Sequence, residues 1–130
     1  MELPDYYFRV RENGAVVYRV TTNQRDQRLE MDPIAVVNVR RGEVKPQGER
    51  TLSDADMAAI TEWMEARLEV LGARELDDIH RAIDHLNLTA QWVQSRASDE
   101  ALEEVTDPLL LAMHDLRTVL VRKKADRLKR

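Results

Sequence analysis

One segment of the sequence carries residue types that bind metal ions. Asp77, His80 and Asp84 follow each other at spacings of three and four residues, so an α-helix places them on one face. Carboxylate oxygens and imidazole nitrogens in such an arrangement bind zinc, manganese or iron in helical bundles. Di-metal bundles take matched ligands from several helices, whereas this sequence offers one set, with His114-Asp115 as a facing group. The alternative is a solvated helix face, and we predict no bound metal and no cofactor.

Other patterns of catalytic residues are missing from the sequence. The chain has no cysteine, which excludes disulfides, thiolate metal sites and cysteine nucleophiles. Its four glycines stand far apart, so neither a phosphate-binding loop nor a dinucleotide-binding motif is present. No serine lies in a G-x-S-x-G pattern, and Ser53 and Ser98 are explained as helix caps. The sequence therefore predicts that the protein is not an enzyme.

Two groups of basic residues are suited to an anionic partner. Near the N-terminus, arginines alternate with aromatic residues, and such an open sheet can stack the bases of RNA or DNA. Residues 122–130 form the second group, with six basic side chains and one acidic side chain. The alternative is that neither group binds a ligand. The arginines then lie on the solvent-exposed face of the sheet, and the C-terminal cations complement the negative end of the helix dipole. The candidate residues for nucleic-acid binding are Arg9, Arg11, Arg19, Arg122, Lys123, Lys124 and Arg127.

Large apolar residues outside the main helical stripes favour a surface for another protein chain. Trp63 and Trp92 lie on secondary faces of their helices, where large aromatic residues favour an interface with a partner. The alternative is that both tryptophans belong to a broad core of a small domain. The last helix is apolar nearly all round, which requires burial on two sides. One side can be covered by the other helices and the second by another copy of the chain, so we predict a homodimer. The candidate interaction residues are Trp63, Trp92, Leu110 and Leu111.

The N-terminal residues predict an antiparallel hairpin. Asn13-Gly14 separates two segments rich in aromatic and β-branched residues, and Asn-Gly is a strong signal for a two-residue turn with positive φ. This turn pairs Arg11 with Val16, whereas a bulged turn slips the pairing by one residue. The face expected to point into the core carries Tyr6, Phe8, Val10 and Val17, with Arg19.

Further short strands are expected after the hairpin. Residues 28–31 alternate in polarity, and Asp32-Pro33 is expected to end that strand. Residues 34–40 form the strongest strand pattern in the chain, and residues 43–45 return beside it. The result is a meander of three to five short strands, whose apolar face needs a cover.

Three amphipathic helices are expected to follow and to pack as a small bundle. The first begins after Ser53 and ends at Gly72, and the second begins near residue 75. The third begins with Pro108 in its first turn. The second helix has a heptad seam that can pack lengthwise on another helix. The seam consists of Leu76, Ile79, Ile83, Leu86, Ala90, Val93 and Ala97.

Charge is distributed unevenly along the chain. Residues 53–107 carry 14 acidic and 4 basic side chains, net −10, whereas residues 108–130 carry 2 acidic and 7 basic ones, net +5. One interpretation is that neighbouring helices compensate each other within the protein. The other is that the basic end binds an anionic partner.

The length of 130 residues suits one domain, with a β-meander over residues 1–50 and a helical part over residues 51–130. The longest strictly apolar run, residues 109–113, is too short to span a membrane. Residues 1–5 lack the pattern of a secretory signal. We therefore expect a cytoplasmic protein without a membrane partner.

Together these observations predict an α+β protein in which a β-meander precedes three helices. The predicted function is that of a small non-enzymatic interaction or regulatory protein, which recognises another protein through its helical faces as a homodimer. Binding of RNA or DNA by the basic C-terminal helix and the arginine-rich sheet is the alternative. A metal-dependent enzyme centred on Asp77, His80 and Asp84 is a third hypothesis.

Overall fold

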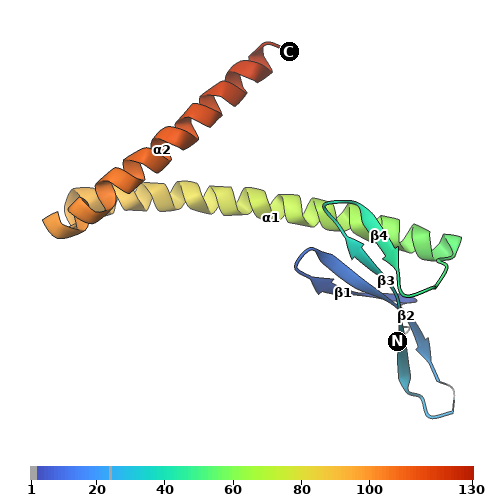
Figure 1. Ribbon diagram of the computed structural model, residues 1–130. Coiled ribbons are helices and arrows are strands. Elements are labelled where there is room, and N and C mark those ends of the chain that lie inside the picture. The colour runs from blue at the N-terminus through green and yellow to red at the C-terminus, as the bar shows by residue number, and fades with distance from the viewer. Residues whose placement is uncertain (1–2, 24) are drawn as a thin grey trace. The chain divides into compact units, whose positions relative to one another are not determined.

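The computed structural model describes residues 3–23 and 25–130. A four-stranded antiparallel sheet precedes the helices, as predicted for an α+β fold (Figure 1). Met1 and Glu2, part of the segment tested for a signal, and Gln24, in an expected loop, lie outside the described residues. The elements are β1 (Tyr6–Arg11), β2 (Gly14–Thr22), β3 (Leu29–Asn38), β4 (Glu43–Pro46), α1 (Asp54–Ser95) and α2 (Asp99–Leu128).

The chain divides into two compact units, Met1–Asp78 and Ile79–Arg130. We call the first the sheet unit, because it holds all four strands together with the first part of α1. The second is the helix unit, which holds the last part of α1 and all of α2. Within the described residues, neither helix combines the length and the apolar character that a membrane span requires.

The hairpin of β1 and β2 turns one residue earlier than the sequence predicts. Arg11 pairs with Gly14 and not with Val16, so the predicted register is wrong by two residues. Neither Asn13 nor Gly14 has a positive φ. Gly14 is required for a different reason, because a Cβ atom there would collide with the carbonyl oxygen of Val37 on β3. The glycine thus serves the close approach of two strands rather than the turn.

The predicted core face of the hairpin survives this shift, because a displacement of two residues preserves the alternation of side chains. Val17 is fully buried, and Tyr6 and Phe8 pack against the core. Val10, expected on the same face, is half exposed near the end of β1. The buried apolar core of the sheet unit consists of Ala15, Val17, Ile34, Ala35, Val37, Val39, Ile60 and Met64.

The third strand is longer than predicted, because it passes through Pro33. The pairing between β2 and β3 is irregular there: Val17 pairs with Ala35 and Tyr18 with Pro33, which leaves Ile34 as an extra residue. The ladder to β4 begins only at Ala35, so Pro33 has a paired neighbour on one side alone. A proline without an N–H group is tolerated at such a position. The prediction that Asp32-Pro33 ends the strand is therefore wrong.

The structure has two helices where three were predicted. Helix α1 begins as expected after Ser53, but it continues through Gly72 to Ser95. A glycine in a helix interior costs about 1 kcal/mol relative to alanine, and good helix formers on both sides of Gly72 offset such a cost. The φ of Gly72 is not positive, so it adopts no left-handed cap. A single glycine did not suffice to end this helix.

The second error concerns the beginning of the last helix. Helix α2 begins at Asp99, and Ser98 caps it by accepting a hydrogen bond from the backbone N–H of Ala101 at 3.1 Å. Pro108 lies inside α2 rather than in its first turn. A proline there removes one backbone hydrogen bond, which the rest of the helix must offset. The capping role predicted for Ser98 is confirmed, whereas the role predicted for Pro108 is wrong.

Candidate interaction surfaces

A buried carboxylate joins the sheet to the start of α1. The side chain of Asp56 is 1% exposed. One of its oxygens accepts a hydrogen bond from the Tyr6 hydroxyl at 2.6 Å, and the other accepts one from the Arg19 guanidinium at 2.7 Å. The backbone N–H of Ser53 also donates to Asp56, and the Ser53 hydroxyl accepts from the backbone N–H of Asp56 in return. This reciprocal capping box satisfies the carboxylate completely.

These contacts determine the protonation state of the group. Burial raises the pKa of Asp56, but the hydrogen bonds from Tyr6, Ser53 and Arg19 outweigh burial and hold the pKa well below its usual range. The hydrogen bond to Asp56 in turn raises the pKa of the Tyr6 hydroxyl. Asp56 is therefore an ionised structural anchor at neutral pH, and it has no proton to exchange with a substrate.

Trp63, a predicted interaction residue, lies against the sheet. Its ring stacks on Phe8 with the two ring centroids 4.7 Å apart and the planes 1° from parallel. Trp63 is half-buried, and it packs against the apolar core of the sheet unit. The structure thus places Trp63 where helix and sheet meet.

The opposite side of the sheet is open. Arg9 pairs with Val16, Val16 with Val36, and Val36 with Lys45, so these four residues form one row across all four strands. Val36 is exposed, whereas its neighbours Ala35 and Val37 are buried on the α1 side. We call this side the open sheet face, and its residues include Tyr7, Arg9, Arg11, Val16, Tyr18, Val36, Glu43 and Lys45.

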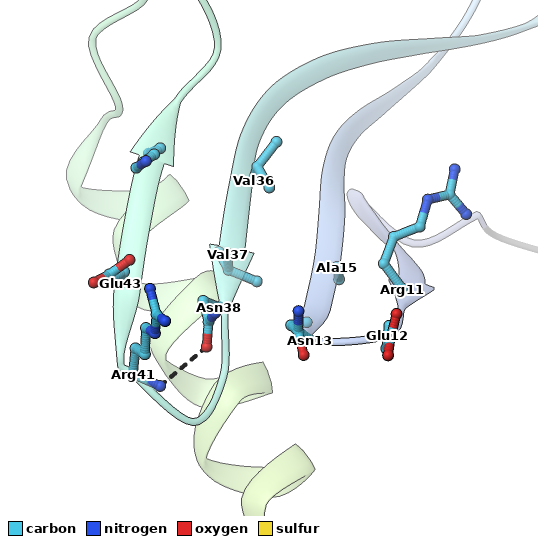
Figure 2. A pocket seen from close by; sticks show the side chains of 11 residues that line it. Arg11, Glu12, Asn13, Ala15, Val36, Val37, Asn38, Arg41 and Glu43 are labelled. Atoms are coloured by element: carbon cyan, nitrogen blue, oxygen red, sulfur yellow. Dashed lines mark hydrogen bonds between the residues drawn. The ribbon is translucent and has the colours of Figure 1, made fainter.

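A hollow of about 440 Å³ lies at the turn end of the sheet (Figure 2). Figure 2 shows Arg11 and Glu12 on one side, Arg41 and Glu43 on the other, and Val36 between them. Among the described residues, the basic side chains that line the hollow form no ion pair. The hollow therefore combines basic side chains that form no ion pair with Glu12 and Glu43, beside an apolar floor.

The three N-terminal arginines proposed for nucleic-acid binding do not act together. Arg9 donates to the Tyr18 hydroxyl at 2.8 Å, and its guanidinium lies 4.6 Å from the centre of the Tyr18 ring. Arg11 lies at the hollow of the open sheet face. Arg19 lies on the other side of the sheet, where it forms the ion pair with Asp56. Two of the three arginines share a surface, and the third has a structural role.

The helix unit has no buried residue at all. Every residue in the range 79–130 is described, and each side chain is either exposed or half-buried. The half-buried residues gather near the connection between α1 and α2, whereas every residue from Leu110 to the C-terminus is exposed. The heptad seam of α1 is also exposed, with Ile79 at 58%. The half-buried residues are Thr89, Trp92, Ala97, Ala101, Leu102, Val105 and Leu109.

An apolar groove of about 360 Å³ runs between the two helices of this unit. We call it the hairpin groove. Leu86, Ala90 and Val93 line it from α1, and Leu109 and Met113 are among the residues that line it from α2. Figure 1 shows α2 turning back at the end of α1 and then leading away from it.

The other predicted interaction residues all lie in the helix unit. Trp92 is half-buried beside a small hollow of about 300 Å³ that Leu88 and Arg96 also line. Leu110 lines the hairpin groove and is exposed, and Leu111 is 68% exposed. The predicted basic residues Arg122, Lys123, Lys124 and Arg127 are exposed near the end of α2.

The residues of the third hypothesis, a metal-dependent enzyme, do not form a metal centre. Among the described residues, no group of three or more histidine, aspartate or glutamate side chains has an arrangement that holds a metal ion. Asp77, His80 and Asp84 are each exposed on α1, and His114 is exposed on α2.

No protein-family model, curated protein or solved structure matches this chain.

Sequence reasoning missed the role of Asp56. The sequence did carry a signal, because Ser53 and Asp56 have the spacing of a capping box. That spacing does not show that the Asp56 side chain is buried. Its burial depends on Tyr6 and Arg19, which are 50 and 37 residues away along the chain.

Proposed function

We propose that this chain is a small non-enzymatic protein that binds other protein chains through its helical faces and does so as a homodimer. The observation that carries the proposal is the helix unit, in which no residue is buried although apolar side chains are abundant. Burying one Leu or Ile side chain stabilises a structure by about 1.5–3 kcal/mol. Two long helices that leave so many apolar side chains in water gain substantially when another chain covers them.

The arrangement of the exposed apolar residues indicates a helical partner. In the helix unit, Ile79, Ile83, Leu86 and Val93 recur at heptad spacing along α1, and all are exposed. A seam with this spacing packs lengthwise against another helix. Polar and charged residues separate the seam positions, as expected for an interface between helices rather than for lipid contact.

Sedimentation of the full chain over a wide range of concentration tests this proposal. We expect a dimer that dissociates on dilution. The double variant Ile83→Ser and Leu86→Ser should raise the dissociation constant at least tenfold, because both side chains lie on the exposed seam. The matched control is Asp77→Ser with Asp84→Ser, which changes the same helix off the seam. A chain that stays monomeric at the highest concentration would exclude self-association.

A second candidate function is binding of single-stranded RNA or DNA at the open sheet face. The observation that favours it is that Arg9, Arg11 and Lys45 share this face with Tyr7 and Tyr18. Tyr7 is exposed and can stack on a base, while unpaired cations attract phosphates.

Fluorescence anisotropy with labelled oligonucleotides at low and physiological salt tests the second candidate. We expect binding that weakens steeply with salt and that is reduced by Arg11→Gln with Lys45→Gln. The matched control is Arg25→Gln with Arg28→Gln, because these exposed arginines lie in the loop between β2 and β3. Absence of binding at low salt would exclude this function.

A further inference from the structure

The second half of α2 carries several apolar side chains that are exposed to water. Leu116, Val119, Leu120 and Val121 are all exposed, with 42–59% of each side chain accessible. The same segment carries five basic side chains between positions 117 and 127. It is therefore an amphipathic, basic helix that no part of its own unit covers.

The first turns of α2 have the opposite charge. Residues 99–107 contain five acidic side chains and no basic one. These turns border the hairpin groove, which Leu102 and Val105 line. The groove lining is apolar apart from Thr89 and Thr106, and the acidic side chains stand on the same turns of α2 outside this lining, where their charge complements that of the second half of α2.

The arrangement of these charges selects one orientation. If two α2 helices lie antiparallel about the centre of the element, between Met113 and His114, position 103 of one helix is level with position 124 of the other. Glu100 is then level with Arg127, and Glu104 with Lys123. Each acidic start meets a basic end, and the contact is the same in both copies, as a two-fold axis requires. A parallel arrangement would place like charges beside each other.

We propose that the occupant of the hairpin groove is the second half of α2 from a second copy of this chain, in an antiparallel and reciprocal arrangement. This inference rests on the proposed function, because it specifies how the homodimer is built. Leu116 and Leu120 of one copy enter the groove of the other, and the basic side chains around them lie beside the acidic start of its α2.

Charge exchange tests the pairing. The triple variant Glu100→Lys, Glu103→Lys, Glu104→Lys should raise the dimer dissociation constant at least tenfold at low salt, and so should Lys123→Glu, Lys124→Glu, Arg127→Glu. A mixture of the two variants should form heterodimers, and the chain that carries all six changes should dimerise again. Loss of dimerisation without rescue in either case would overturn the antiparallel pairing.

Cross-linking tests the orientation directly, because the natural chain has no cysteine. With a short bismaleimide, Met113→Cys should cross-link to itself, whereas Glu103→Cys and Lys124→Cys should cross-link only when the two are mixed. A dimer in which Glu103→Cys links to itself would be parallel and would refute the inference. A dimer without any of these links would also refute it while leaving the proposed function intact. A wild-type chain that remains monomeric in sedimentation would refute both.

Discussion

The two units of this chain differ in how far they bury their apolar side chains. The sheet unit holds every buried residue that the structure describes, from Gly14 to Met64. The helix unit has none, although Ile83, Leu86 and Leu120 are as apolar as any core residue. A four-stranded sheet with one covered face encloses a core within its own chain, whereas two helices that diverge from one connection enclose very little. The helix unit is thus suited to obtain its core from another chain.

Matched isoleucines provide the largest contrast between the units. Ile60 is 0% exposed, so Ile60→Ala should cost about 2–5 kcal/mol of unfolding free energy because it leaves a cavity. Ile79→Ala should cost less than about 0.5 kcal/mol in the dilute monomer, since its side chain is already in water. Urea unfolding followed by the fluorescence of Trp63, in a Trp92→Phe background, reports on the sheet unit. Equal costs for the two substitutions would contradict the contrast.

Removing the charge of Asp56 should have the next largest effect. Asp56→Asn should destabilise the sheet unit by about 2–4 kcal/mol, because Arg19 and Tyr6 lose an ionised partner that is buried. The matched control is Asp32→Asn. Asp32 accepts two hydrogen bonds from Arg50, but this pair is exposed and should contribute less than about 1 kcal/mol. Chemical unfolding at pH 7 measures both values.

The Asp56 carboxylate should also make the unfolding free energy of the sheet unit depend on pH. Because the pKa of Asp56 is lower in the folded than in the unfolded chain, its contribution to stability is complete above the unfolded value of about 4 and declines as the pH falls below it. Unfolding followed by Trp63 fluorescence between pH 6 and pH 2 should show this decline. Asp56→Asn should flatten it, and an unchanged slope in this variant would show that other groups cause it.

The smallest expected effect concerns the helix that runs through both units. Gly72→Ala should stabilise α1 by up to about 1 kcal/mol, because Gly72 is helical and a Cβ atom there meets nothing within 4 Å. Circular dichroism during thermal unfolding measures the change. A destabilised variant would indicate that α1 is interrupted at Gly72, as the sequence alone had suggested.

The errors in the predicted ends of elements share one physical origin. Gly72 and Pro33 weaken an element locally and are predicted to end it, and Pro108 is predicted to begin the last helix. In the structure the flanking residues carry the element through all three positions. Breaking residues impose local costs, about 1 kcal/mol for glycine and about 3 kcal/mol for proline in a helix interior, so the free energy of the neighbouring turns or strand pairs decides whether an element stops.

The sequence predicts the surroundings of some residues of the candidate surfaces better than those of others. Leu110 and Leu111 are exposed on α2, and their role in an interaction stays a prediction. Trp63 is also a predicted interaction residue, yet its ring stacks on Phe8, a residue 55 positions earlier in the chain. Only the approach of α1 to the sheet distinguishes these two uses of a large apolar side chain.

The sequence by itself determined the α+β order of elements, the core face of the hairpin and the caps at Ser53 and Ser98, because these depend on local spacing and alternation. It also determined the charge asymmetry along the chain. Only the tertiary structure decided that Arg19 and Asp56 pair across the sheet and α1, that Gly14 serves a close strand contact, and that the helix unit lacks a core. These features depend on which distant segments meet, and local patterns do not specify that.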